Sequence, residues 1–251
     1  MWRASYFDGR GPSGREELPV ALAVGSVPGR RSVSGTVLSY EVLDLEDVVE
    51  ISGVPVLRPV PALFHELRRP QPWREAVVAL DMAAAARLSS TPRLREHLRA
   101  HRHWRRAARV GRVLEHAGRD SRSPGETRLR LVWTVDAGLP PPWENRALYD
   151  LDGRLVCIPD LFDEVAGLVA EYDGAEHLTL GRRVHDDARE EACRRLGLEY
   201  ARFTGPDVRD TGRAVRRLLT ARSRALFLPP GARGWTLEPP STGWAGRWRT
   251  G

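Results

Sequence analysis

Hydrophobic and polar positions follow two different patterns in the first half of the chain. The runs PVALAVGS (19–26), GTVLSYEVL (35–43) and DVVEISGVPVLRP (47–59) are rich in β-branched residues and are separated by glycines and acidic turns, which predicts a small sheet. PALFHELRR (61–69) and WREAVVALDMAAAARL (73–88) carry apolar residues at three- and four-residue spacing, which predicts two helices. Ser90-Thr91-Pro92 is typical of a helix start, so we expect a third helix from about 92 to 117.

A second pattern begins after GRDSRS (118–123), where glycine, aspartate and serine interrupt the helical spacing and predict a boundary. The expected order is then helix (123–138), strand (143–150), strand (154–162), strand (165–173), helix (182–196), strand (198–203) and helix (206–224), with a hairpin turn at 151–153. We therefore expect an α/β (α+β) protein, with a β/α region at 19–118 and a second domain at 121–224. Residues 1–18 predict a flexible end, and the Pro-, Gly- and Trp-rich residues 229–251 predict a disordered tail.

The length and composition exclude several classes of protein. No run of the 251 residues approaches the roughly 20 apolar residues of a membrane span. The first residues lack the apolar core of a signal peptide, so we expect a cytoplasmic protein. Cys157 and Cys193 offer neither a disulfide framework nor a metal-knuckle spacing, and we expect both as small buried apolar residues in a reducing compartment.

The basic residues are unusual in kind. The chain contains no lysine, so all 39 basic residues are arginines, and the net charge is +6 with an isoelectric point near 10.1. The simplest interpretation of this bias is a GC-rich genome that favours arginine codons, but the guanidinium group also binds phosphate in a bidentate manner. The charge suits a polyanionic partner, and we expect DNA.

The strongest charge cluster lies between Thr91 and Arg122, where ten arginines stand against Glu96, Glu115 and Asp120, a local balance of 10 − 3 = +7. Two interpretations are equally open: a solvated basic helix face, or a surface that follows a phosphate backbone. The irregular histidines at 97, 101 and 103 do not predict a metal site. The candidate nucleic-acid contacts in this cluster are Arg102, Arg105, Arg109 and Arg112.

The candidate chemistry lies in LVCIPDLFDEVAGLVAEYDGAEH (155–177). Asp160 and Glu171 are on two apolar runs joined by a short acidic turn, so an antiparallel hairpin would bring them together, with Asp173 and His177 just beyond. Hard divalent cations such as Mg²⁺ bind convergent carboxylates and keep positions open for water and phosphate. The pattern favours a metal-dependent nuclease.

Glu126 is a further candidate acid. Ser123-Pro124-Gly125-Glu126 has the residues of a capping box at a helix start, which explains Glu126 without catalysis. The alternative is that its carboxylate also points at the site, because the start of a helix packed on the hairpin can supply a third acid.

The expected αβββαβ order, with S-P-x-E before a helix, then P-D, then E-x-D-G-x-x-H, resembles the PD-(D/E)xK nuclease superfamily. Within it the chain is most similar to very-short-patch-repair-like (Vsr-like) endonuclease domains of unknown function, over about residues 121–222. Asp186 with Arg189, Leu196-Gly197 and Arg202-Phe203 support the match. The resemblance implies a restriction-endonuclease-like core.

The resemblance also implies roles for single residues. Asp160 and Glu171 would hold Mg²⁺, or Mn²⁺, together with a backbone carbonyl between Glu171 and Asp173. Glu126 would be an outer acid, and His177 a base or a donor near the phosphate. Arg189 and Arg202 could contact phosphate or form internal ion pairs.

One position departs from the superfamily motif. Asp173 stands where lysine is usual, and the chain has no lysine to replace it. Vsr-like domains commonly have E-x-D-G there, and catalysis would then depend on metal-activated water, with His177 as a possible helper. The alternative function is a nuclease-fold DNA-binding protein that has lost cleavage and acts as an antitoxin-like or transcriptional regulator. Residues 35–118 resemble the middle region of AbiEi-like antitoxin-type proteins, which fits that alternative.

Overall fold

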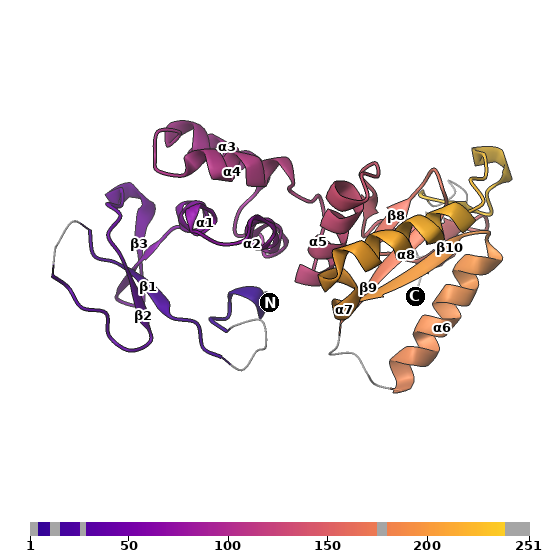
Figure 1. Cartoon of the computed structure of the whole chain (residues 1–251), viewed down its shortest axis with the longest axis horizontal. Coiled ribbons are helices and arrows are strands. Elements are labelled where there is room, and N and C mark those ends of the chain that lie inside the picture. The colour runs from indigo at the N-terminus through magenta and orange to yellow at the C-terminus, as the bar shows by residue number, and fades with distance from the viewer. Residues whose placement is uncertain (1–4, 11–15, 26–28, 175–179, 239–251) are drawn as a thin grey trace, which may run out of the picture. The chain divides into compact units, whose positions relative to one another are not determined.

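The structure, a computed structural model, describes residues 5–10, 16–25, 29–174 and 180–238, the last range without the side chains of 180–187. The chain forms two compact units, Met1–Ala117 and Gly118–Gly251, and the sequence interruption at 118–123 lies at the start of the second (Figure 1). Both contain helices and strands, so the predicted mixed α/β class is confirmed. In the described part of the chain, no helix combines the length and apolarity needed to cross a membrane.

Unit 1 begins with two small sheets. Strands β1 (Val20–Ala23) and β2 (Thr36–Ser39) pair in parallel, and β3 (Val48–Ile51) and β4 (Val54–Leu57) form an antiparallel hairpin. These strands lie within the three runs expected to be β-structure. Short 3-10 turns occur at η1 (Ser5–Phe7) and η2 (Leu45–Asp47).

Four helices complete unit 1: α1 (Pro59–Arg68), α2 (Trp73–Ala85), α3 (Thr91–Ala100) and α4 (Ala107–Glu115). The first two match the predicted helices, and the Ser90 side chain accepts a hydrogen bond from Arg93 N at the predicted start of α3. Their facing sides bury a core that includes Phe64, Leu80 and Val110.

The expected single helix over 92–117 is wrong, because the chain breaks between α3 and α4. Arg106 takes a left-handed conformation, with φ of 62°, at the N-cap position of α4. Trp104 leaves the helical path and packs against His101, with 4.6 Å between ring centroids. The aromatic contact lies in the turn at 101–106, where no glycine or proline marks the break. The arginines therefore occupy two helices and a turn, not one stripe.

Unit 2 is built on a four-stranded sheet in the order β10-β9-β8-β5. Strand β8 (Leu161–Asp163) is antiparallel to both of its neighbours, β5 (Trp143–Glu144) and β9 (Leu168–Asp173), whereas β10 (Glu199–Thr204) runs parallel to β9. Along the chain these strands and their helices follow the order α5–β5–β8–β9–α6–β10. Strands β6 (Leu148–Asp150) and β7 (Leu155–Cys157) form the expected hairpin at 151–153, but in a separate small sheet.

Helices cover both faces of the four-stranded sheet. Leu161, Leu168 and Phe203 pack against α5 (Pro124–Leu131), its π-helical continuation η3 (Val132–Asp136), α7 (Gly205–Arg209) and α8 (Thr211–Arg224). Phe162 and Val169 point to the opposite face, where Cys193 of α6 (Leu180–Arg195) and the small sheet lie. Figure 1 shows α8 and α6 on either side of β9 and β10.

The tail predicted to be disordered is ordered over 229–238. A 3-10 turn η5 (Pro230–Ala232) leads to β11 (Trp235–Thr236), which pairs with β6. Trp235 is buried, with its ring 5.0 Å from that of Phe162 in an edge-to-face contact. Arg233 lies 4.6 Å above the Trp235 ring and pairs with Glu164. Burial of one large aromatic residue, Trp235, thus orders a segment predicted to be disordered because it lacks a periodic hydrophobic pattern.

Candidate active site

The β8–β9 hairpin brings the two main candidate acids together. Leu161 is opposite Ala170 in the antiparallel register, so Asp160, immediately before β8, comes opposite Glu171. The two side chains leave the same face of the sheet. Asp160 Oδ2 accepts a hydrogen bond of 2.7 Å from Tyr172 N, which holds the carboxyl against β9. The hairpin expected from the eleven-residue spacing is present.

Glu126, at the third position of α5, is tied to the same place. It is only 8% exposed, and its Oε2 accepts hydrogen bonds of 2.8 Å from Arg122 N and from Asn145 Nδ2. Asn145 also donates its backbone N–H to the carbonyl of Asp160, at 3.1 Å. Asn145 is therefore hydrogen-bonded to the carboxylate of Glu126 and to the backbone carbonyl of Asp160. Its left-handed conformation, with φ of 49°, is typical of asparagine in a tight turn.

The predicted capping box is half formed. The Ser123 hydroxyl accepts a hydrogen bond of 3.2 Å from Glu126 N, as expected for an N-cap. The Glu126 carboxylate accepts from Arg122 N, one residue before the cap, and from Asn145. The hydrogen bond with Asn145 joins the Glu126 carboxylate to a residue outside α5. Glu126 therefore lies at the edge of the site as well as at the helix start.

The charges of the three acids act on one another. Burial, and then the negative charges of Glu126 and Glu171, raise the pKa of Asp160 to about 7, against the opposing effect of the Tyr172 N–H. A carboxyl that titrates near neutrality is common at functional sites but also occurs in structural networks. Here burial is the largest cause, and the negative charges of the neighbouring carboxylates add to it.

Glu171 has two partners on the same face. Arg189 Nη1, on α6, is 3.2 Å from Glu171 Oε1, and the Tyr200 hydroxyl, on β10, donates to Glu171 Oε2. Burial and the charge of Glu171 raise the pKa of Tyr200, so the phenol stays protonated and remains a donor. The internal ion pair left open for Arg189 is thus present.

The remaining predicted residues are only partly placed. Asp173 ends β9 two positions after Glu171 and therefore leaves the sheet on the same face. Arg202, opposite Glu171 on β10, has its Nη2 3.8 Å from Glu190 Oε2 of α6. His177 and the side chain of Asp186 lie outside the described residues.

Sequence reasoning missed the residues that position the acids. Tyr172 projects to the other face of β9 and packs against Gly125 in the first turn of α5. Its hydroxyl is 3.2 Å from where a Cβ of Gly205 would lie. The Tyr172 ring therefore fixes the start of α5, and with it Glu126, relative to β9. The alternation along β9 could have shown that Tyr172 faces away from Glu171, but no local signal indicates its contact with Gly125.

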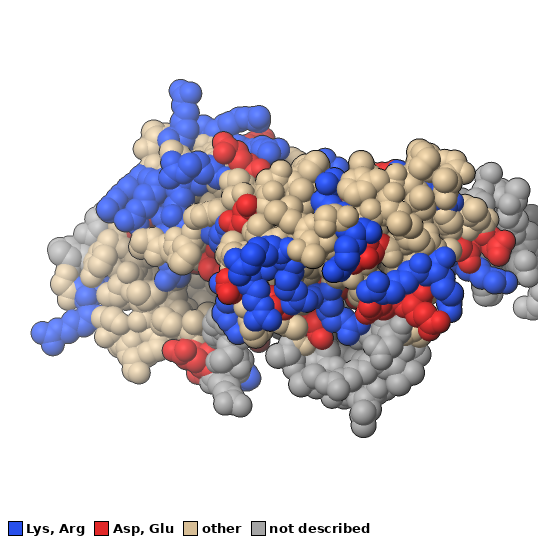
Figure 2. Space-filling model, turned by 45° about the vertical axis from the view of Figure 1, so that its right-hand side comes forward, with Lys and Arg blue, Asp and Glu red and all other residues tan. Residues whose placement is uncertain are grey.

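The arginines of the second candidate surface are mostly exposed. Figure 2 shows blue side chains gathered at the upper left of the view, over the part of unit 1 that α3 and α4 form. We call the exposed set the arginine surface of unit 1. Its members are Arg93, Arg95, Arg99, Arg102, Arg105, Arg106 and Arg112.

Arg109 belongs to the fold of unit 1 instead. Its Nε donates to the Leu67 carbonyl at 3.1 Å, and its Nη2 donates to the Gln71 carbonyl. Both carbonyls lie at or just beyond the C-terminal end of α1, where helical carbonyls lack partners within the helix. The guanidinium predicted to contact nucleic acid therefore ties α4 to α1.

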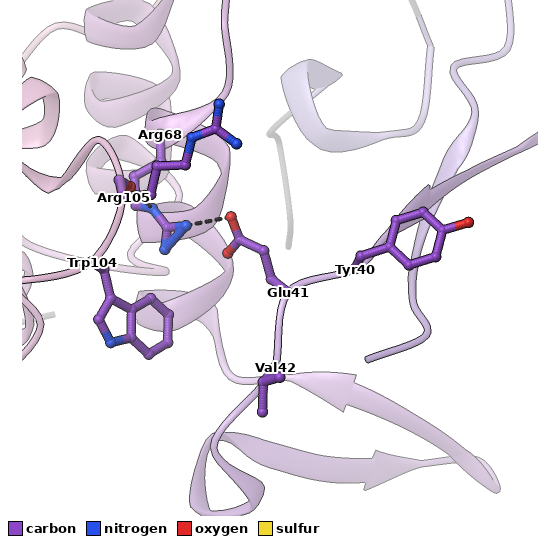
Figure 3. Close-up of a pocket in the computed structure, with 6 residues that line it drawn as sticks. All are labelled: Tyr40, Glu41, Val42, Arg68, Trp104 and Arg105. Atoms are coloured by element: carbon purple, nitrogen blue, oxygen red, sulfur yellow. Dashed lines mark hydrogen bonds and ion pairs between the residues drawn. The ribbon is translucent and has the colours of Figure 1, made fainter. Parts of the chain in front are cut away.

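A shallow pocket of about 430 Å³ lies beside the arginine surface, lined by Tyr40, Glu41, Val42, Arg68, Trp104 and Arg105. Figure 3 shows Arg68 and Glu41 pointing toward one another, whereas Tyr40 points away from the pair. Arg68 is 5% exposed, and its Nε donates to the Arg105 carbonyl at 3.0 Å. These contacts hold the turn between α3 and α4 in place.

Comparison of the chain with protein-family models, curated proteins and solved structures finds no match.

The residues at 126, 160 and 171 fit a divalent metal in the chemistry of their donors, since all are carboxylates with hard oxygens. Burial and the negative charges of Glu126 and Glu171 raise the pKa of Asp160, and a bound cation would offset those charges. Within the parts of the chain that the structure describes, however, no three histidine, cysteine, aspartate or glutamate side chains lie together as ready metal ligands. Arg189 Nη1 lies 3.2 Å from Glu171 Oε1, so a cation at this site would compete with that guanidinium for the carboxylate.

Proposed function

We propose that unit 2 is a metal-dependent endonuclease domain that hydrolyses phosphodiester bonds in DNA, with Mg²⁺ or Mn²⁺ as its cofactor. The observation that carries this proposal is the placement of Asp160 opposite Glu171, with Glu126 close enough to raise the pKa of Asp160. The resemblance of S-P-x-E, P-D and E-x-D-G to the Vsr-like branch of the PD-(D/E)xK superfamily supports it.

Asp160 and Glu171 would hold the cation, and Glu126 would be an outer acid. Asn145 connects Glu126 to this pair, because it donates both to the Glu126 carboxylate and to the backbone carbonyl of Asp160. A cation held by these carboxylates would lower the pKa of a water bound to it and would offset charge on the phosphate. Asn145 orients the carboxylate of Glu126, and the Tyr172 N–H orients that of Asp160, before substrate binds. Tyr200, as a protonated donor, orients Glu171. His177 remains the proposed base for the water, or a donor to the phosphate.

The arginine surface of unit 1 would supply the DNA affinity. Exposed guanidinium groups bind phosphates independently of sequence. Arg102, Arg105 and Arg112 carry this part of the proposal, because the structure leaves them exposed. Arg189 and Arg202 would contact phosphate only after they release their carboxylate partners. These partners are Glu171 for Arg189 and Glu190 for Arg202.

The test is cleavage of supercoiled plasmid by the full chain with Mg²⁺, Mn²⁺ or EDTA. Asp160→Asn removes the charge at nearly constant shape, and it should abolish cleavage. Asp152→Asn is the matched control, because Asp152 is exposed in the β6–β7 turn. Metal-dependent cleavage by Asp160→Asn at the rate of the unsubstituted chain would reject the site.

Two observations favour a second function. Both oxygens of Glu171 are engaged, by Arg189 and by Tyr200, and the superfamily lysine is absent. The second function is that of a protein that no longer cleaves DNA but binds it as an antitoxin-like or transcriptional regulator. In such a protein the contacts of Glu171 with Arg189 and Tyr200 would serve stability only. It would bind DNA with a strong salt dependence, would give no metal-dependent product, and would bind as well with Asp160→Asn as without it.

A further inference from the structure

The only two cysteines of the chain meet inside unit 2, although they are far apart in sequence. Cys157 ends β7, Cys193 lies in the last turn of α6, and their sulfur atoms are 3.4 Å apart. Both side chains are buried. A disulfide bond joins sulfur atoms at about 2.05 Å, so the two sulfurs need to approach by roughly 1.4 Å. Side-chain rotation and small shifts of α6 can supply such a movement.

We propose that Cys157 and Cys193 form a modification site at which a peroxide oxidant produces a reversible disulfide between β7 and α6. One cysteine sulfur, as the thiolate, attacks an oxygen of hydrogen peroxide, the O–O bond breaks, and hydroxide leaves to become water. The sulfenic acid that remains is attacked by the second sulfur, which loses its proton. The S–S bond forms, and the sulfenic oxygen leaves as a second water. Two thiols are oxidised by two electrons in all, and one peroxide is reduced to two waters.

The surroundings of the pair make this a slow reaction. Leu148, Phe162, Leu198 and Trp235 belong to the same buried cluster as the two cysteines. The hydrogen bond with Cys193, followed by burial, raises the pKa of Cys157, so little thiolate exists at neutral pH. The pair therefore responds to sustained oxidation, and faster at alkaline pH, and it is not a rapid peroxide sensor.

The disulfide would enclose part of the candidate site. Asp160, Glu171 and Arg189 all lie between the two cysteines in sequence. Arg189 is four residues before Cys193, which is about one helical turn. A bond at Cys193 would tie this turn of α6 to β7 and restrain Arg189 beside Glu171. This consequence rests on the proposed function: because Arg189 would compete with the metal for Glu171, a disulfide that restrains Arg189 there should slow metal-dependent cleavage reversibly.

The modification itself is tested without any activity. The full folded chain is treated with hydrogen peroxide, alkylated, and measured by intact mass under non-reducing conditions. We expect a monomer lighter by about 2 Da, a cross-linked peptide pair containing residues 157 and 193, and full return with dithiothreitol. The unfolding midpoint should rise by roughly 10 °C, because the bond closes a loop of 36 residues.

Two single variants provide the control. Cys157→Val and Cys193→Ala should each lose the mass change and the rise in midpoint, and if one fails to fold, the other suffices. Unsubstituted chain that gains only oxygen, or only forms linked dimers, would overturn the proposal. The proposal would also be overturned if the folded chain keeps both thiols at a peroxide concentration that oxidises them in the urea-unfolded chain.

A plasmid assay on the same samples separates the two proposals. Formation of the disulfide with slower cleavage supports both the modification site and its effect on Arg189. If the disulfide forms and cleavage is unchanged, the effect on Arg189 is overturned. If the disulfide forms in a chain that never cleaves DNA, the modification site is supported and the proposed nuclease function fails.

Discussion

Gly125 and Tyr172 are in such close contact that a β-carbon built on Gly125 would lie 2.0 Å from Cε1 of the Tyr172 ring. Gly125 is in the first turn of α5, next to Glu126, and Tyr172 follows Glu171 on β9. One contact therefore sets the distance between two of the three candidate acids. Only glycine permits this approach, so the identity of residue 125 is tied to the geometry of the site.

Gly125→Ala should displace either the Tyr172 ring or the start of α5. Overpacking of this kind costs about 1–3 kcal/mol of stability, and the shift of Glu126 should reduce any cleavage more than the lost stability explains. Chemical denaturation and plasmid cleavage measure the two effects. Gly231→Ala is the control, because no atom lies within 4 Å of its added β-carbon. Adding Tyr172→Leu to Gly125→Ala should recover stability, because the smaller side chain makes room for the added β-carbon. If the stability losses of the two single variants simply add in the double variant, the Tyr172 ring is not what clashes with that carbon.

The hairpin that carries the acids could be predicted because it is local. Asp160 and Glu171 are separated by a short turn between apolar strands, so register and face follow from the period of two. The contact of Tyr172 with Gly125 and the hydrogen bond of Asn145 to Glu126 join segments whose spacing has no local pattern. These contacts depend on how α5 packs on the sheet, which one sequence does not specify.

The raised pKa of Asp160 predicts a dependence of stability on pH. An unperturbed aspartate has a pKa near 3.9, whereas Asp160 titrates at about 7 in the folded chain. Between these values the folded state binds the extra proton, so the contribution of Asp160 to stability falls as pH rises through this window and stays low above it. Asp160→Asn should remove this fall and be the more stable chain at pH 8, as measured by denaturant unfolding at pH 5, 6, 7 and 8. Parallel pH profiles for the two chains would contradict the assignment.

Arg189 is predicted to compete with the metal for Glu171. Arg189→Ala should lower the Mn²⁺ concentration for half-saturation about threefold to tenfold, which corresponds to about 1 kcal/mol for a partly exposed ion pair. Calorimetric titration of Mn²⁺ into the DNA-free chain measures this directly. Arg195→Ala is the matched control on the same helix, since Arg195 pairs with Glu191 at the surface. Weaker metal binding by Arg189→Ala would mean that Arg189 organises the acids and does not block them.

Trp235 shows where the sequence misleads. The stretch from 229 to 238 has no period, and its proline and glycine residues predict disorder, yet one tryptophan fills a gap between the two sheets of unit 2. Burial of a single large side chain stabilises a segment without leaving a pattern along the chain.

Trp235→Ala should therefore cost about 3–5 kcal/mol of unfolding free energy, as for other buried aromatic residues. Leu226→Ala, at a position that is 61% exposed, should cost less than about 1 kcal/mol. Urea unfolding followed by far-ultraviolet circular dichroism compares the two. Equal and small losses would place residues 229–238 outside the folded core.

The break between α3 and α4 also changes which arginines can meet DNA. Arg109 bonds two backbone carbonyls, whereas Arg102 and Arg105 are exposed in the turn. Each phosphate contact contributes about 0.9 to the slope of log affinity against log salt concentration. Arg102→Gln with Arg105→Gln should therefore lower that slope by about 1.8, without changing sequence preference, as measured by fluorescence anisotropy on duplex DNA.

The control for this surface is Arg31→Gln, an exposed arginine of unit 1 outside α3 and α4. It removes one positive charge but should leave the slope within about 0.3, because it lies outside the proposed contacts. Arg109→Gln separates the two roles of the cluster. It should destabilise unit 1 through the lost contacts to Leu67 and Gln71, and DNA binding by the folded fraction should keep its salt slope. Arg31→Gln could instead lower the salt slope by as much as the loss per arginine in the turn. That result would indicate binding by net charge alone, and the arginine surface would then have no special role.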